Sequence, residues 1–151
     1  MSLTYVATFT GVSISAQQDL FSILAPAVVP IKIMWIRLSC LSQSTASEVS
    51  LNLLRISAPT QGSGGTVITP VEKGQVSGRV STATVHANDT VLATGTLGLL
   101  WADTMQVLNG WDYLPIPELW DQIPASDIFS LRLVAAASVV MSGSIAWSES
   151  V

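Results

Sequence analysis

Charged side chains are what this sequence has least of. The chain has 151 residues, of which ten are acidic and six basic, while 49% are apolar. Soluble domains usually carry about a quarter Asp, Glu, Lys and Arg, so this surface has less than half the usual charge. The six basic residues form no run, and the net charge of −4 repels phosphate, which excludes an electrostatic nucleic-acid binder. A chain with this apolar content can bury a hydrophobic core, which excludes intrinsic disorder.

Histidine and cysteine are also nearly absent, with one of each. A zinc or iron site of the His and Cys type needs at least three such ligands, so we expect no metal and no cofactor. Cys40 stands in an apolar run and has no partner for an intrachain disulfide, which predicts a buried, unreactive thiol. His86, close to Asn88 and Asp89, is expected to be a partly exposed polar residue before a turn.

An uninterrupted apolar run of membrane-spanning length is missing. The best stretches, 20–36 and 133–147, are broken by Pro26, Pro30 and Lys32 or diluted by Ser and Gly, and both are typical of strands. The N-terminus has neither the basic region nor the apolar segment of a secretory signal. We therefore expect no membrane partner and synthesis in a host cytoplasm.

What is abundant is Ser and Thr, 20 and 13 residues, placed between Val, Ile, Leu and aromatic residues. In 48–53 and again in 141–148 the apolar and polar side chains alternate, which is the two-residue period of a strand with one buried face. No stretch has both a helix cap and a clean apolar stripe. The sequence therefore predicts an all-β protein.

Turn signals divide the chain into about eight strands. We place them at 3–10, 19–24, 31–41, 48–57, 82–86, 91–102, 128–135 and 139–149, with a turn at Ala87-Asn88-Asp89. Two connections, 59–81 and 103–127, are too long for hairpins and suit Greek-key crossings. The prediction is one domain spanning 1–151, an antiparallel β-sandwich of the jelly-roll type.

The second long connection holds the one acidic and aromatic cluster. Paired carboxylates can cut a sugar, and rings next to carboxylates can bind one, so glycosidase chemistry and saccharide stacking are both open. Structural cover or a subunit contact is the preferred interpretation, because Pro115 and Pro117 stiffen the segment and aromatics are enriched at interfaces. The cluster consists of Asp112, Glu118, Asp121 and Asp127 with Trp111, Tyr113 and Trp120.

A glycine-rich stretch, 61–66, lies in the first long connection. It lacks the Lys and following helix of a phosphate-binding loop, so its glycines indicate flexibility or positive φ in a long surface loop.

The scarcity of charge gives the main functional hint. Outward strand positions carry Ser, Thr, Asn and Ala where a freely soluble monomer would carry Lys and Glu. Cores of protein interfaces are likewise depleted in charge. We therefore expect a homo-oligomer, a lattice component, or both.

The order of these features resembles the small jelly-roll capsid decoration (cement) proteins of tailed bacteriophages. The resemblance extends over most of the chain and depends on turn and strand signatures, none of them catalytic. They are the strand Tyr5-Val6-Ala7-Thr8-Phe9 with the following 14–21, the loop 62–66 leading to Thr69-Pro70, the turn 87–90, Gly110-Trp111 with Pro115 and Pro117-Glu118, and the closing strand 141–145.

This resemblance implies a non-enzymatic virion protein on the capsid exterior, bound to the major capsid protein and to itself as a dimer or trimer. From loop length, the arm 1–3 and the connection 59–81 are expected to touch the shell, with Leu3, Gly64, Thr66 and Pro70 as candidate contacts. Trp111, Tyr113 and Trp120 are expected between subunits or at a domain end. The alternatives are a carbohydrate-binding module and a tail or baseplate structural protein.

Overall fold

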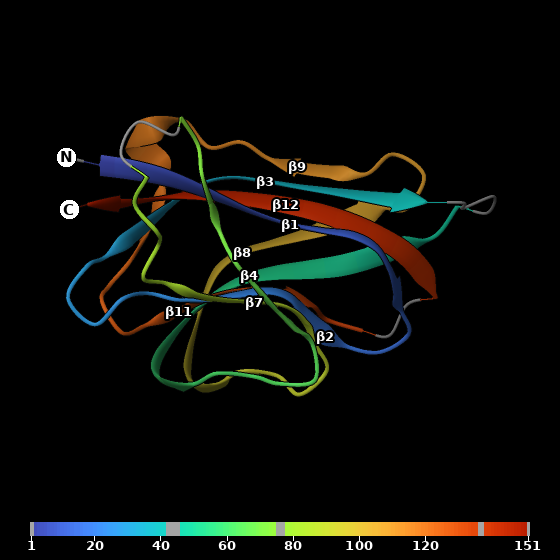
Figure 1. Cartoon of the computed structure of the whole chain (residues 1–151). Coiled ribbons are helices and arrows are strands. Elements are labelled where there is room, and N and C mark those ends of the chain that lie inside the picture. The colour runs from blue at the N-terminus through green and yellow to red at the C-terminus, as the bar shows by residue number, and fades with distance from the viewer. Residues whose placement is uncertain (1, 42–45, 75–77, 136–137, 151) are drawn as a thin grey trace.

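The computed structural model describes residues 2–41, 46–74, 78–135 and 138–150. Two antiparallel sheets lie face to face, as Figure 1 shows. The described residues contain no α-helix, and their one helical turn is the 3₁₀ turn η1 (Pro117–Leu119). No helix in this part of the chain has the length and apolar character needed to cross a bilayer. The predicted antiparallel β-sandwich is confirmed.

The first sheet is built around the two longest-range partners in the chain, its first and last strands. β1 pairs with β12 over nearly its whole length, β12 pairs with β3, and the far side of β3 carries both β9 and β10. The bounds are β6 (Val71–Glu72), β1 (Ser2–Ile14), β12 (Val139–Ser150), β3 (Ile31–Leu41), β9 (Trp111–Tyr113) and β10 (Asp121–Ile123).

The second sheet has the order β5-β7-β2-β11-β4-β8, with all neighbours antiparallel. Its central strands β2 and β11 are buried along almost their whole length, whereas β8 is exposed at nearly every position. The bounds are β5 (Thr66–Ile68), β7 (Thr84–Asp89), β2 (Gln18–Leu24), β11 (Ile128–Leu133), β4 (Glu48–Thr60) and β8 (Thr94–Gln106).

All eight predicted strands are present, and four short ones were missed. The connections predicted at 59–81 and 103–127 contain β5, β6, β9 and β10 and the end of β8, so they are not simply loops. The turn predicted at 87–89 is wrong, because these residues continue β7 and Asn88 takes a positive φ of 59° inside the strand. β1 to β4 alternate between the two sheets, as the crossings of a jelly roll require, but that finer class stays a prediction.

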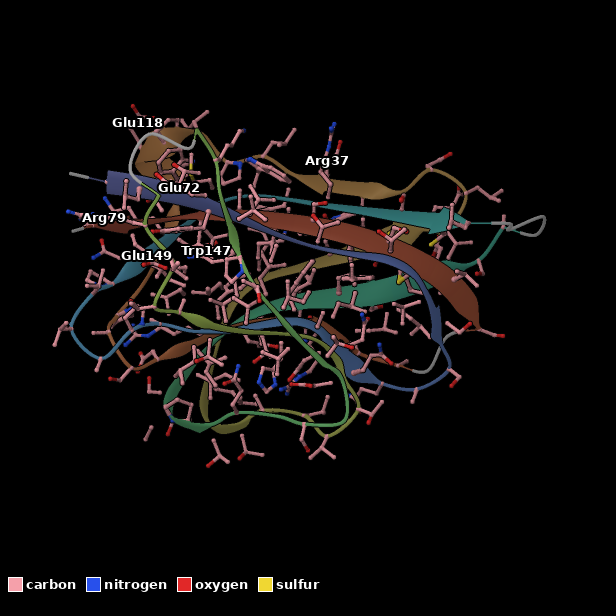
Figure 2. All side chains as sticks on the ribbon, in the orientation of Figure 1. Arg37, Glu72, Arg79, Glu118, Trp147 and Glu149 are labelled. Atoms are coloured by element: carbon pink, nitrogen blue, oxygen red, sulfur yellow. The ribbon has the colours of Figure 1, made fainter. Side chains whose placement is uncertain are left out.

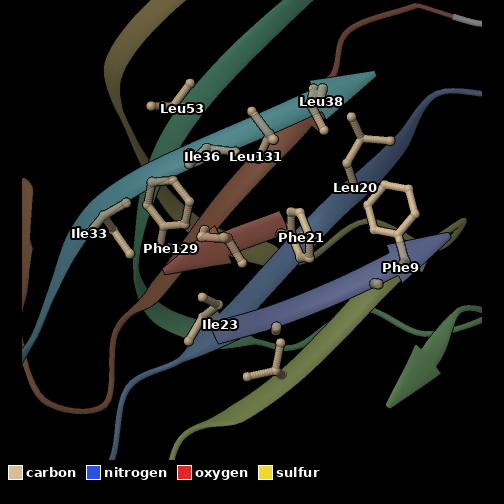
Figure 3. Packing of buried hydrophobic residues seen from close by; sticks show 14 of the residues in the cluster. Phe9, Leu20, Phe21, Ile23, Ile33, Ile36, Leu38, Leu53, Phe129 and Leu131 are labelled. Carbon is tan, nitrogen blue, oxygen red and sulfur yellow. The ribbon is translucent and has the colours of Figure 1, made fainter. Parts of the chain in front are cut away.

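The core lies between the sheets and is aromatic and aliphatic throughout. Phe9 of β1 packs on Phe21 of β2 with ring centroids 5.1 Å apart, and Phe129 of β11 lies further along the same layer (Figure 3). At one end Tyr5 packs on Trp147, with centroids 6.1 Å apart. Each of these side chains is at least nine-tenths buried, and burying one contributes roughly 1.5–3 kcal/mol. The alternating pattern read from the sequence therefore does select the inward side chains.

The two ends of the chain lie side by side, because β1 and β12 are neighbours (Figure 1). Leu3 pairs with Glu149 and is 7% exposed, within the core cluster. The expectation of a free arm is therefore wrong for Leu3, whose side chain packs inside its own fold. Met1 lies outside the described residues.

A buried carboxylate fixes the end of the first predicted loop to the last strand. Glu149 is 3% exposed, and its Oε1 accepts hydrogen bonds from Trp147 Nε1 at 3.1 Å and from Ser81 Oγ. Ser81 Oγ also accepts from the backbone N–H of Ala83 at 3.1 Å. Figure 2 places Trp147 and Glu149 at the same end of the sandwich as Glu72 and Arg79. The segment before β7 is thus held against β12.

Candidate interaction surface

An open groove of about 420 Å³ lies where β8, at the edge of the second sheet, faces β9 and η1 of the first. Its floor and walls are mostly apolar, and three carboxylates stand along it. The segment beside it, 107–120, is the middle part of the predicted connection 103–127 and is here called the connector. The groove is lined by Leu100, Trp101, Tyr113, Leu114, Pro115 and Leu119, with Asp103, Asp112 and Asp121.

Three aromatic rings form a row beside this groove. Trp111 and Tyr113 are stacked, with centroids 6.1 Å apart and planes 11° from parallel, because both side chains leave the same face of β9. Trp101 on β8 meets Tyr113 at 6.2 Å with the planes tilted by 53°. Trp111 is buried at the core side of the row, while Trp101 is 52% exposed at its outer side. The accessible ring is therefore Trp101.

Trp101 was missed as a candidate, and Trp120 was grouped with the wrong rings. Trp120 makes no ring contact in the described part of the chain, and its indole N–H donates to the carbonyl of Pro115 at 3.2 Å. The available signal for Trp101 was the apolar alternation Leu97, Leu99, Trp101 within a predicted strand. Joining that strand to the connector required knowledge of the tertiary structure.

Two of the carboxylates hold the aromatic row in place. Asp103 accepts from Trp111 Nε1 at 2.9 Å and from the backbone N–H of Thr104 at 2.7 Å. The bond from Trp111, and then that from Thr104, lower the pKa of the Asp103 carboxyl. Asp121 accepts from the Tyr113 hydroxyl at 2.8 Å. Burial, and next this bond to a carboxylate, raise the pKa of the Tyr113 phenol well above its usual value.

The predicted acidic cluster is only partly brought together, because Asp112 and Asp121 both line the groove whereas Asp127 does not. Asp112 forms a bidentate pair with Arg37 of β3 on the exposed face, with N to O distances of 3.0 and 3.2 Å. This pairing raises the pKa of the Arg37 guanidinium, first through the hydrogen bonds and then through the opposite charge. Asp127 pairs instead with Arg55 of β4 at 2.8 Å, and Glu118 lies on η1. Asp112 and Asp127 are therefore each paired with an arginine of a different strand.

Exposed apolar side chains gather along β8 and the connector. Leu97 and Leu99 are 52% and 60% exposed, and they lie opposite Ile56 and Leu54 of β4. The connector adds Leu114, Ile116 and Leu119, which are 62%, 59% and 67% exposed. Large exposed apolar patches often mark contact sites, so these side chains are candidates for contact with a partner.

The glycine-rich loop is fixed on the second sheet. Gly65 N–H donates to Asp89 Oδ1 at 3.1 Å, and Ser63 forms a bridge with Val91. Gly64 has a φ of 88°, and a Cβ there would lie 2.4 Å from the Thr90 hydroxyl. Of the two predicted roles for these glycines, positive φ is confirmed at Gly64, whereas the hydrogen bond and bridge of 63–65 do not fit a flexible loop. Of the other candidate shell contacts, Thr66 begins β5 and is exposed, whereas Pro70, between β5 and β6, is half-buried.

His86 contacts Asp89, the residue that also binds the glycine-rich loop. Its Nδ1 lies 3.0 Å from Asp89 Oδ2, and the side chain is 19% exposed, as expected for a partly exposed residue. Ser22, opposite His86 on β2, has a buried hydroxyl with no hydrogen-bond partner in the described chain.

Chemistry-bearing groups elsewhere are sparse. Within the described ranges, no three His, Cys, Asp or Glu side chains stand close enough together to hold a metal ion. Cys40 is only partly buried, at the margin of the core, and burial raises the pKa of its thiol. The predicted fully buried thiol is therefore corrected to a half-covered one.

The groove and the aromatic row beside it therefore form the candidate interaction surface. Comparison with protein-family models, with curated proteins and with solved structures finds no match for this chain.

Proposed function

We propose that this chain is a non-enzymatic virion structural protein, a capsid decoration (cement) protein that binds the outer surface of a phage head and bridges capsid subunits. The observation that carries the proposal is the concentration of exposed apolar side chains on β8 and the connector, in a chain with only 16 charged residues. The resemblance to phage cement proteins is the reason for naming the phage head as the assembly that this chain joins. The partners are the major capsid protein and further copies of this chain.

The mechanism is stabilisation by binding. A rigid sandwich that contacts two capsid subunits adds binding free energy only to the assembled shell, and so shifts the equilibrium towards it. Repeated over a lattice, weak contacts suffice, because each occupied site raises the effective concentration for the next. The connector is the part we assign to the shell, since Leu114, Ile116 and Leu119 project from it into solvent.

Copy number in purified phage particles tests the proposal. Quantitative mass spectrometry relative to the major capsid protein should give a ratio equal to one or to a simple fraction. A few copies per particle would move the protein to the tail or baseplate, and absence from the particle would overturn the virion role.

Docking by the connector has its own test, with purified shells lacking this protein and the wild-type or variant chain added back. We expect Ile116→Lys together with Leu119→Lys to weaken shell binding at least about tenfold, because charge replaces apolar contact. Val28→Lys is the matched control, since Val28 is 86% exposed in the turn before β3 and does not line the groove. Unchanged binding of the connector variant would refute this assignment.

A carbohydrate-binding module is the second candidate, favoured by one observation. Trp101 and Tyr113 present ring surface to a groove that also carries carboxylates, which is how proteins stack on sugar rings and accept hydroxyl protons. A glycan array probed with wild-type chain and with Trp101→Ala decides it. Binding lost in the variant supports the module, and no binding by either removes it.

A further inference from the structure

The edges of the two sheets differ greatly in length. Three are formed by strands of two or three residues, namely β6, the pair β9 and β10, and β5. The fourth is β8, with 13 residues, and the described chain has no neighbour on its far side. Proteins usually protect edges by keeping them short, because a free edge presents unpaired N–H and C=O groups to other strands. β8 is the exception in this fold.

The composition of β8 also lacks the usual protection. Residues 94–106 include no Lys, Arg or Pro, and the one charged residue is Asp103. Its carboxylate accepts a hydrogen bond from the backbone N–H of the neighbouring Thr104, so this charge is engaged within its own strand. Between Thr94 and Ala102 the strand carries only uncharged residues, with Leu97, Leu99 and Trp101 more than half exposed. The pairing of β8 with β4 shifts register between Leu99 and Trp101, so the regular stretch suited to pairing with another strand is Thr96–Leu99.

We propose that β8 pairs antiparallel with β8 of a second copy of this chain, so that the second sheet continues from one subunit into the other. Strand edges are satisfied by strand edges, and within the described chain the one edge of matching length is β8 itself. Two-fold symmetry makes such a contact self-complementary.

Side-chain chemistry fits a two-fold axis near Gly98. Leu97 of each copy then lies opposite Leu99 of the other, and apolar cross-strand pairs stabilise a ladder. Gly98 at the axis has open space around its Cα, because an added Cβ would meet only the Arg55 carbonyl at 3.6 Å. The two Asp103 carboxylates fall at opposite ends of the pairing, so no like charges meet. The apolar strip of Leu54 and Ile56 then continues through both copies.

This inference rests on the proposed function, because it specifies how copies of the chain associate. The β8 pairing can nevertheless fail while the proposed virion role stands. Sedimentation velocity on the purified chain should give a dimer, or a higher oligomer built from dimers. Leu99→Lys should raise the dissociation constant by roughly 100-fold or more, because two lysines would be buried beside the axis. Val67→Lys on β5 is the matched control, since Val67 is 68% exposed at the opposite edge of the same sheet and should leave the oligomer unchanged.

Amide hydrogen exchange on the unsubstituted chain tests the β8 pairing without a substitution that could itself disturb folding. In the oligomer, edge N–H groups of residues 96–99 should be protected, and dilution below the dissociation constant should release them. An oligomer with freely exchanging β8 amides, or one that survives Leu99→Lys, overturns the β8 pairing but leaves self-association standing. A monomer at submillimolar concentration overturns both. Protection that appears only on phage shells would assign the edge to the capsid protein instead.

Discussion

Asp19 and Arg132 lie opposite each other on β2 and β11, with Arg132 Nε 2.6 Å from Asp19 Oδ1 and both side chains buried. Asp19 also accepts from Ser130 Oγ and from the backbone N–H of Ala93, each at 2.8 Å. Arg132 Nη2 in turn donates to the Ala93 carbonyl at 2.9 Å. The pair therefore fixes the residue that precedes β8, and with it the position of the free edge.

Removing one partner of this pair should destabilise the fold strongly. Asp19→Ala and Arg132→Met should each lower the free energy of unfolding by about 3–5 kcal/mol, because the other charge stays buried without its partner. The double variant should lose less than the two single losses combined, since the charges interact. Urea denaturation measures all three. Arg37→Met is the control, because its pair with Asp112 is largely exposed to solvent and should contribute little to stability.

Gly143 is a packing constraint in the middle of β12. A Cβ at this position would lie 2.7 Å from Phe9 Cε1 and 2.9 Å from Leu38 Cδ2. Gly143→Ala should therefore cost about 1–3 kcal/mol of stability through overpacking. Gly98→Ala, also within a strand, is the comparison and should cost less, because its Cβ meets no close neighbour. Equal midpoints in urea for both variants would contradict this account.

The chain has two tyrosines, and both should resist ionisation in the folded state. Burial raises the pKa of Tyr5, with smaller contributions from Glu149 and Glu72, and burial followed by the bond to Asp121 raises that of Tyr113. A raised pKa in the folded state means stability that is present below the unfolded pKa of about 10 and is lost as pH rises through the folded value. Absorbance at 295 nm should show ionisation near pH ~10 in urea and only at higher pH in buffer. Native ionisation near the urea value would refute it.

Asp103 should titrate in the opposite sense. Its pKa is lowered chiefly by the bond from Trp111, so its stabilising contribution is present above the unfolded value of about 3.9 and is lost as pH falls through the lower folded value. The Trp111 indole N–H resonance should therefore hold its position through pH ~4 and shift only below it. Asp103→Asn should abolish that acid shift. An indole resonance that titrates with the ordinary carboxyl pKa would argue against the hydrogen bond.

The sequence alone determined the fold class and the course of its long strands. The alternation of apolar and polar residues in segments such as 48–53 is local, and a buried face selects it at every second position, so eight strands could be predicted with modest errors at their ends. The scarcity of charge is likewise visible without a structure. Short strands such as β9 were missed because three residues hold too little periodicity, and their pairing depends on a distant partner, β3.

The tertiary structure decided which side chains form the surface. Trp101 meets Tyr113 although the two are on different sheets, and Asp127 of the predicted cluster binds Arg55 instead. It also decided that β8 is an edge, since nothing in residues 94–106 says whether a strand will lie on that side. Sequence patterns encode which face of a strand is buried, whereas its neighbours are set by how the whole chain closes its two sheets.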